Sequence, residues 1–315
     1  MKATWVGEAD TLRPLAAAPS WRAQPRVLFR LMDYWKLTKP RIAVMALFTV
    51  AAGYWLGAGL SASPRVLVNT LIGAGLLAAG GSALNQLFER AIDARMWRTR
   101  NRPLPAGRVT PQEVAIFGAV LCGVGSAYLT ATVPAPAALV ATLTAACYVL
   151  IYTPLKTRTV WNTVVGAVPG ALPPVIGWCA ARGHTDLAGA AVLFLVLFFW
   201  QVPHFLAIAW MFRDDYARGG LRMLPGMDPS GSKTAAVMVV TTTALVPLGF
   251  LAMASGLAGW VSAVGVAVFG CLFLRKALAF ARARTDAHAR AVLRGSLFYL
   301  PGVFSLFLLE SLLLR

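Results

Sequence analysis

The sequence predicts an all-α membrane protein, built as a single bundle of about nine transmembrane helices. Hydrophobic residues make up 58% of the 315 residues and charged residues only 13%, with a mean hydropathy of +0.67. Soluble domains carry roughly 25% charged residues, so this composition excludes an ordinary soluble fold. Apolar runs long enough to cross a bilayer recur along the chain, and basic residues collect between alternate runs.

Nine apolar segments have the length of a membrane span. They are Ile42–Leu60, Val66–Leu84, Glu113–Val133, Ala137–Pro154, Asn162–Ala181, Leu187–Met211, Ala235–Ser255, Ala258–Leu274 and Gly295–Leu314. With the N-terminus inside, every Lys and Arg except Arg65, Arg182 and Arg315 falls on the inner side. This asymmetry is the one that the positive-inside rule requires, so we expect the N-terminus inside and the C-terminus outside. We expect residues 1–40 to form a mobile basic tail before one transmembrane domain, 41–315.

The net charge of +17 does not indicate a nucleic-acid partner. The cations are spread over alternate loops of the bundle, where membrane topology and anionic lipid account for them. The four cysteines all lie within expected spans and form no Cys-x-x-Cys pair, so we interpret them as small packing residues. They are Cys122, Cys147, Cys179 and Cys271.

The first polar cluster follows the second span. Asn85, Glu89 and Asp93 recur every four residues, so a helix would place their oxygen atoms along one stripe. Six arginines crowd the same stretch: Arg90, Arg95, Arg98, Arg100, Arg102 and Arg108. Oxygen ligands beside dense arginine suit a hard cation that itself holds a phosphate. A solvated inner loop would account for the arginines but not for the acidic stripe. Pro103 should end the helix and let Arg98 and Arg102 fold back over the phosphates.

Two further clusters lie on the same expected side of the membrane. After the sixth span, Asp214 and Asp215 are within reach of a cavity shared with Asp93, and Arg213 could contact a diphosphate; an ordinary charged helix end is the alternative. After the fourth span, the inner loop that follows Tyr152 carries Lys156 and Arg158, which are either diphosphate anchors or simple topology signals.

His204 lies within the sixth span, about ten residues before Asp214 and so about 15 Å deeper by helical rise. At this depth it is either a satisfied structural histidine or a residue with a ligand or proton-handling role. A transporter built from inverted repeats would place polar features near the midplane of both halves. Here they gather on one side, which favours an enzyme.

The motifs carry a resemblance. Asn85-x-x-x-Glu89-x-x-x-Asp93, running on to Arg102-Pro103-Leu104, resembles the first aspartate-rich motif of the UbiA-type membrane prenyltransferases. Four further segments are similar to one branch of them, the protohaem IX farnesyltransferases. These are Leu37–Arg41, Tyr152–Lys156, Trp200–Phe205 and Asp214–Pro225. The resemblance covers roughly residues 37 to 225.

The resemblance implies farnesyl diphosphate and haem B as substrates in a lipid bilayer, with the downstream haem A synthase as a further partner and no nucleic acid. Mg²⁺ would be held by Asn85, Glu89, Asp93, Asp214 and Asp215, while Arg98, Arg102 and Lys156 neutralise the leaving diphosphate. Tyr152, Arg158, His204 and Arg213 complete the implied substrate contacts. An aromatic, quinone-precursor prenyltransferase of the same fold is the alternative.

Two departures from the family pattern concern the metal. Glu89 stands where the first motif usually has aspartate, and Trp210 or Met211 stands where the second motif has its first aspartate. A second metal ion would therefore have fewer protein ligands here.

Overall fold

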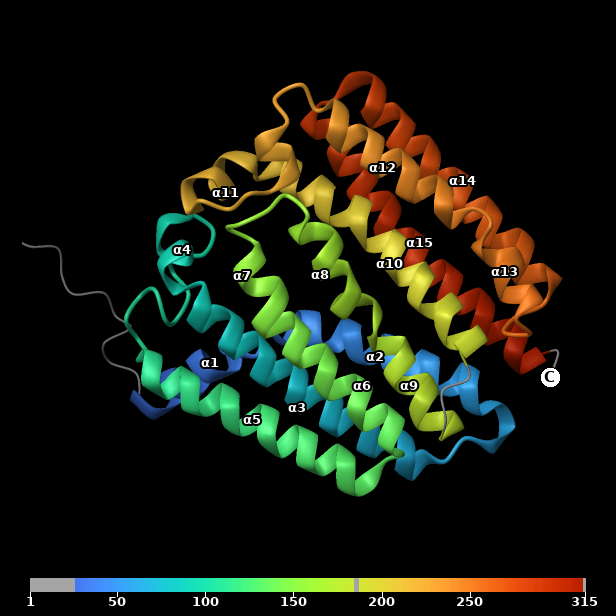
Figure 1. Cartoon of the computed structure of the whole chain (residues 1–315), viewed down its shortest axis with the longest axis horizontal. Coiled ribbons are helices and arrows are strands. Elements are labelled where there is room, and N and C mark those ends of the chain that lie inside the picture. Colours follow the sequence, from blue (N-terminus) through green and yellow to red (C-terminus); the bar gives the residue numbers. More distant parts are fainter. Residues whose placement is uncertain (1–25, 184–186, 314–315) are drawn as a thin grey trace, which may run out of the picture.

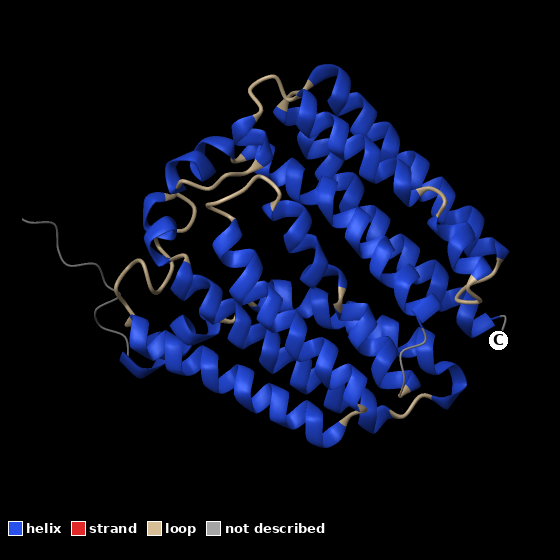
Figure 2. Cartoon of the chain, viewed as in Figure 1, coloured by secondary structure: helices blue, strands red, loops and turns tan. Residues whose placement is uncertain are grey.

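The computed structural model describes residues 26–183 and 187–313, which are almost entirely helical (Figure 1). The elements are α1 (Arg26–Leu37), α2 (Pro40–Ala58), η2 (Gly59–Ser61), α3 (Pro64–Phe88), α4 (Arg90–Arg95), α5 (Pro111–Thr132), α6 (Ala135–Ala146), η3 (Cys147–Tyr152), α7 (Thr153–Leu155), α8 (Asn162–Ala171), α9 (Pro173–Arg182), α10 (Leu187–Met211), α11 (Arg213–Gly219), η4 (Leu224–Met227), α12 (Ser232–Leu245), α13 (Leu248–Ala254), α14 (Trp260–Ala283) and α15 (Asp286–Leu313). No strand occurs in these ranges (Figure 2).

The expected nine spans are confirmed for the described residues. By length and composition, nine helical segments are able to cross a bilayer. They are Pro40–Ala58, Pro64–Phe88, Pro111–Thr132, Ala135–Leu155, Asn162–Arg182, Ala188–Met211, Ser232–Ala254, Trp260–Ala283 and Asp286–Leu313. Three of these spans contain a local break in the α-helix: a π-helical turn at η3, and prolines between α8 and α9 and before α13.

Two expected boundaries differ from the structure. The inner loop predicted between the last two spans is helical except at Arg284 and Thr285, because α14 and α15 continue far beyond their apolar cores. A span predicted from hydropathy ends at the first charged residue. The helix itself can continue, because long basic side chains near its end can extend to polar surroundings. Residues 1–25 of the expected tail lie outside the described residues, and residues 26–37 form α1 rather than an irregular tail.

Helix α1 is tied to the bundle on one face. Asp33 is buried and accepts two hydrogen bonds of 3.1 Å from Arg108 Nε, in the loop that follows α4. Tyr34 packs edge-on against Phe117 of α5 at 5.0 Å between ring centroids. Helix α1 therefore fixes the connection between α4 and α5 from the side.

Close helix packing depends on glycine at the crossing of α2 and α9. A Cβ atom on Gly177 would lie 1.9 Å from the carbonyl oxygen of Val50, and one on Gly53 would lie 2.0 Å from that of Pro174. Only glycine allows the two backbones to approach this closely, as in other membrane helix pairs. All four cysteines are free thiols; Cys179 is buried and Cys271 is exposed.

The crossing of α2 and α9 yields the first prediction. Gly177→Ala should lower the melting temperature of the detergent-solubilised protein by several degrees, since overpacking costs about 1–3 kcal/mol. Gly123→Ala is the matched control, because a Cβ atom at Gly123 of α5 meets open space. Equal melting temperatures for the two variants, measured by scanning fluorimetry, would contradict the assigned crossing.

Candidate active site

The first polar cluster lies where the C-terminal end of α3 meets the start of α2 and the short helix α7. Asn85 is fully buried; its Oδ1 accepts a hydrogen bond of 2.8 Å from Lys39 Nζ, and its Nδ2 donates one of 3.0 Å to Thr153 Oγ1. Glu89 pairs with Lys156, with 2.5 Å between Oε1 and Nζ. Two lysines from distant parts of the chain thus converge on the stripe predicted from the sequence.

The stripe remains helical although α3 ends at Phe88. The backbone N–H of Glu89 donates to Asn85 O at 3.0 Å, and that of Asp93 donates to Glu89 O at 2.8 Å. The i to i+4 spacing therefore carries through the break between α3 and α4. As predicted, the side chains of Asn85, Glu89 and Asp93 follow one another, and all three are buried.

Asp93 is held from the loop that follows α4. Arg102 Nη1 lies 2.7 Å from Asp93 Oδ2, so the chain does fold back and bring Arg102 to the stripe. The helix ends at Arg95, earlier than Pro103 alone would require. The second carboxylate oxygen, Oδ1, is buried without a hydrogen-bond partner. An unpaired buried carboxylate oxygen is costly and is a vacant position for a positively charged ligand.

Lys156 reaches Glu89 because of the π-helical turn η3. Its ammonium group lies 4.4 Å from the centre of the Tyr152 ring, a cation–π contact. Tyr152 itself packs against α8 at Gly166, where a Cβ atom would lie 2.3 Å from the ring. The π-helical turn η3 thus ends at Tyr152, the residue that contacts Lys156, and π-helical turns are frequent at functional sites.

The loop after α4 is anchored to α11, which lies beside α4 in Figure 1. Asp215 Oδ1 accepts a hydrogen bond of 2.8 Å from the backbone N–H of Trp97 and one of 2.9 Å from Arg218. Its Oδ2 accepts a 3.4 Å bond from the N–H of Arg98. Both oxygens of Asp215 are thereby used to position the loop, a task that the sequence analysis did not assign to it.

Arg98 belongs to the same loop but turns toward α11. Its Nη2 donates to the hydroxyl of Tyr216 at 2.9 Å, and its guanidinium lies 5.1 Å from the Phe212 ring centre. Arg98 is exposed, whereas Arg102 is half-buried beside Asp93. The loop therefore places Arg102 against the acidic stripe and holds Arg98 at the exposed edge of the cluster, against α11.

Four predicted site residues lie outside this cluster in the structure. Arg213 pairs with Asp286 of α15 at 2.9 Å, and Arg158 and Asp214 are exposed. His204 Nδ1 shares a hydrogen bond of 2.8 Å with Ser296 Oγ, and its ring stacks on Trp200. These contacts give Arg213 and His204 structural partners on α15.

Lys39 is the functional candidate that the sequence analysis missed. It directly precedes Pro40, the first residue of a span, and its backbone is left-handed, with φ 48°. Such a conformation is strained for a residue with a side chain and is frequent at functional sites. The signal was present in the segment Leu37–Arg41, but a lysine beside a membrane span resembled one more topology signal.

Burial and neighbouring charges set the protonation of these groups. Burial, followed by the charges of Arg102 and Lys156, lowers the pKa of Lys39 to about 7. Burial would raise the pKa of Glu89, but Lys156 and Lys39 outweigh it and lower that pKa. Burial raises the pKa of Asp93, against the opposing effect of Arg102. An anion placed beside Lys39 would favour its ammonium form.

The donor set fits one hard cation. Asn85, Glu89 and Asp93 supply amide and carboxylate oxygens, the ligands that Mg²⁺ prefers, and Asp93 Oδ1 is free to bind. Across the described ranges, no three His, Cys, Asp or Glu side chains converge as a metal site. Asp214 and Asp215 therefore do not join Glu89 and Asp93 around one ion in this structure.

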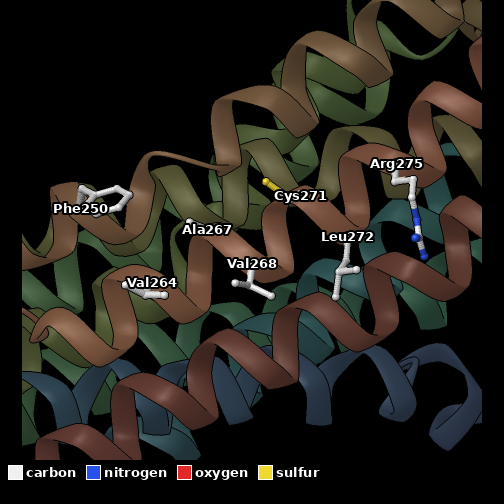
Figure 3. Close-up of a pocket in the computed structure, with 7 residues that line it drawn as sticks. All are labelled: Phe250, Val264, Ala267, Val268, Cys271, Leu272 and Arg275. Carbon is white, nitrogen blue, oxygen red and sulfur yellow. The ribbon is translucent and has the colours of Figure 1, made fainter.

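A groove of about 420 Å³ lies elsewhere, on the outer face of α13 and α14 (Figure 3). Phe250 lines it, together with one face of α14 from Val264 to Leu272, and Arg275 stands at one end. It shares no element with the polar cluster and is almost wholly apolar. A bilayer would cover this surface, so it is not a candidate for catalysis.

The UbiA prenyltransferase family matches residues 46–301 of the chain. The chain belongs to this family. It is therefore a membrane prenyltransferase, and the polar cluster lies at the motif from which the resemblance was inferred.

Relatives cover nearly the whole chain. It is 41% identical over 289 residues to "Protoheme IX farnesyltransferase" of Solibacter usitatus, covering 89% of this chain and 99% of the relative. It is 42% identical over 280 residues to the protein of the same name from Salinibacter ruber, with the same coverage. A mitochondrial relative from Arabidopsis thaliana is 38% identical, over 88% of this chain and 64% of its own length.

Solved structures share the fold at low sequence identity. A digeranylgeranylglyceryl phosphate synthase superposes with a TM-score of 0.74 at 17% identity, covering 90% of this chain and 98% of its own. A UbiA homolog from Archaeoglobus fulgidus, bound to GPP and Mg²⁺, superposes with a TM-score of 0.61 at 15% identity, covering 87% and 99%. The arrangement of helices is thus that of the UbiA fold.

The contacts of α11 yield a second prediction, which separates a positioning role from a ligand role. Asp215→Asn should raise KM for the prenyl diphosphate about tenfold while changing kcat less, because it loosens the loop that carries Arg102. Asp214→Asn, the matched control on the exposed neighbour, should leave both constants near their original values. Loss of all activity in Asp214→Asn would contradict the assignment and return Asp214 to the metal ligands.

Proposed function

We propose that the chain transfers a farnesyl group from farnesyl diphosphate to a vinyl group of haem B, which gives haem O, and that it requires Mg²⁺. The observation that carries the proposal is the buried cluster of Asn85, Glu89 and Asp93, faced by Lys39, Lys156 and Arg102. Acidic oxygens can hold a cation while the surrounding cations hold a diphosphate. The names of the relatives support farnesyl and haem as the two substrates.

Each residue then has a task. Asn85, Glu89 and Asp93 would hold Mg²⁺, which would stabilise the negative charge that develops on the leaving diphosphate. Lys156 and Arg102 contact the leaving diphosphate, with Arg98 at the rim of the site. To reach the phosphates, Lys156 and Arg102 exchange their carboxylate partners for phosphate oxygens.

The chemistry balances with water as the third reactant. The allylic C–O bond of farnesyl diphosphate breaks and its electron pair leaves with the diphosphate, which the surrounding cations stabilise. The vinyl group of haem B donates its π electrons to the farnesyl carbocation and forms the new C–C bond. Water adds to the cation that remains next to the porphyrin ring and loses a proton, which leaves a hydroxyl group.

The membrane setting suits both substrates. The farnesyl chain and the porphyrin are apolar, so a site at the inner ends of membrane helices can accept them from the bilayer. We propose that the protein resides in the bacterial cytoplasmic membrane with its N-terminus and active site facing the cytoplasm, as the distribution of Lys and Arg suggests. A haem A synthase as downstream partner remains a prediction.

The third prediction tests the reaction and its metal. Membranes that contain the protein should convert haem B to a more hydrophobic haem, detected by chromatography, when farnesyl diphosphate and Mg²⁺ are supplied. EDTA should stop the reaction and Mg²⁺ should restore it. Asp93→Ala should abolish it while the protein remains in the membrane, whereas full activity in this variant would contradict the site. Transfer to 4-hydroxybenzoate instead of haem B would favour the alternative, an aromatic prenyltransferase.

The fourth prediction concerns the diphosphate contacts. Lys156→Ala and Arg102→Ala should each weaken farnesyl diphosphate binding about tenfold to a hundredfold, the effect of losing one charge-assisted contact. Haem affinity should change much less. Arg158→Ala, on the exposed part of the same loop as Lys156, is the control. An unchanged dependence on farnesyl diphosphate in both site variants would contradict the assignment.

The fifth prediction concerns His204. His204→Ala should impair haem binding and spare prenyl diphosphate binding, because the residue lies on α10 far from the polar cluster in sequence and depth. Ser296→Ala removes only the partner hydroxyl of His204 and serves as the control for packing. The measurement is a haem titration of both variants beside a diphosphate titration. Normal haem affinity and turnover in His204→Ala would leave the residue a purely structural role.

A further inference from the structure

Lys39 is a half-buried amine without an acidic partner. No carboxylate of the described residues lies within ion-pair distance of its ammonium group, which donates only to the neutral amide of Asn85. By contrast, Lys156 and Arg102 pair with Glu89 and Asp93. An anionic ligand would stabilise the ammonium form of such a lysine, and the left-handed backbone of Lys39 is a strained conformation of the kind found at functional sites.

A second metal ion finds no ligands on the facing side of the site. Asp215, the nearest acidic candidate, already accepts hydrogen bonds at both oxygens from Trp97, Arg98 and Arg218. Asp214 is exposed, whereas Glu89 and Asp93 are buried side by side on the α3–α4 stripe. Trp210, which packs edge-on against Phe280 and lies under the Arg213 guanidinium, has no side-chain oxygen to offer a metal. The oxygen donors available to metals are therefore those of the α3–α4 stripe.

We propose that this site binds its prenyl diphosphate with a single Mg²⁺, and that the ammonium group of Lys39 contacts the diphosphate where a second metal ion would otherwise stand. This inference rests on the proposed function and deepens it. Lys39 is then a substrate-binding residue. Asn85 links the two sides of the site, since its amide accepts a hydrogen bond from Lys39 and donates one to Thr153.

The test counts metal ions with a spectroscopic probe and does not depend on turnover. The purified full-length protein is titrated with Mn²⁺ in the presence of farnesyl S-thiolodiphosphate, an analogue that resists ionisation. Free Mn²⁺ is followed by electron paramagnetic resonance. We expect one Mn²⁺ bound per chain together with the analogue, and a spectrum without coupling between two ions.

Two variants assign the effect to Lys39. Lys39→Ala should weaken analogue binding about tenfold or more, and Lys39→Asp, which supplies a carboxylate, should bind a second Mn²⁺. Lys36→Ala is the matched control: its side chain is mostly exposed, 3.9 Å from Asp33, and both metal count and affinity should stay unchanged. Thermal stability of each variant is measured alongside.

The possible outcomes distinguish failure of the single-metal inference from failure of the proposed prenyltransferase function. Two coupled Mn²⁺ ions in the wild-type protein with the analogue bound would overturn the single-metal inference and leave the prenyltransferase proposal intact. Unchanged analogue affinity in a folded Lys39→Ala variant would overturn the role of Lys39. Failure of the wild-type protein to bind the analogue with Mn²⁺ would overturn the proposed function, and this inference with it.

Discussion

The structure depends on the pairing of buried charges at one end of the membrane helices. Glu89 and Asp93 are buried, and each carries a cationic partner from another segment, Lys156 at 2.5 Å and Arg102 at 2.7 Å. Removing one partner of such a pair is far more destabilising than a lost surface contact. The same pairs bring together α3, α4, α7 and the loop before α5. The groups assigned to substrate binding therefore also hold these segments in their folded arrangement.

Around these pairs, a second set of polar contacts fixes the loop that carries Arg102. Asp215 holds its beginning through the backbone of Trp97 and Arg98, and Asp33 of α1 holds its end through Arg108. Both acidic residues are buried, and neither touches the stripe of α3 and α4 in the structure. A mobile loop would lose the orientation of Arg102, so these contacts convert a long inner connection into a rigid part of the site.

The sequence predicted the span count, the fold class and the acidic stripe, since each follows from a regular period or from composition. The i to i+4 spacing of Asn85, Glu89 and Asp93 holds in three dimensions. Long-range partners could not be predicted in this way. Lys156 is a predicted site residue, but its pairing with Glu89, like the contact of Lys39 with Asn85, joins residues distant in sequence and was not predicted. The sequence indicates a ligand role for Asp215 because its backbone partner, the Trp97 N–H, carries no signature in the sequence.

The central claim is that the metal and diphosphate take over partners that the charged residues now give one another. It is tested most directly by a cryo-electron microscopy structure with Mg²⁺ and farnesyl S-thiolodiphosphate bound. The account predicts that Lys156 Nζ leaves Glu89 for a phosphate oxygen, and that the metal contacts Asp93 Oδ1, which now has no partner. An intact pair of Lys156 and Glu89, with the diphosphate bound elsewhere in the bundle, would contradict it.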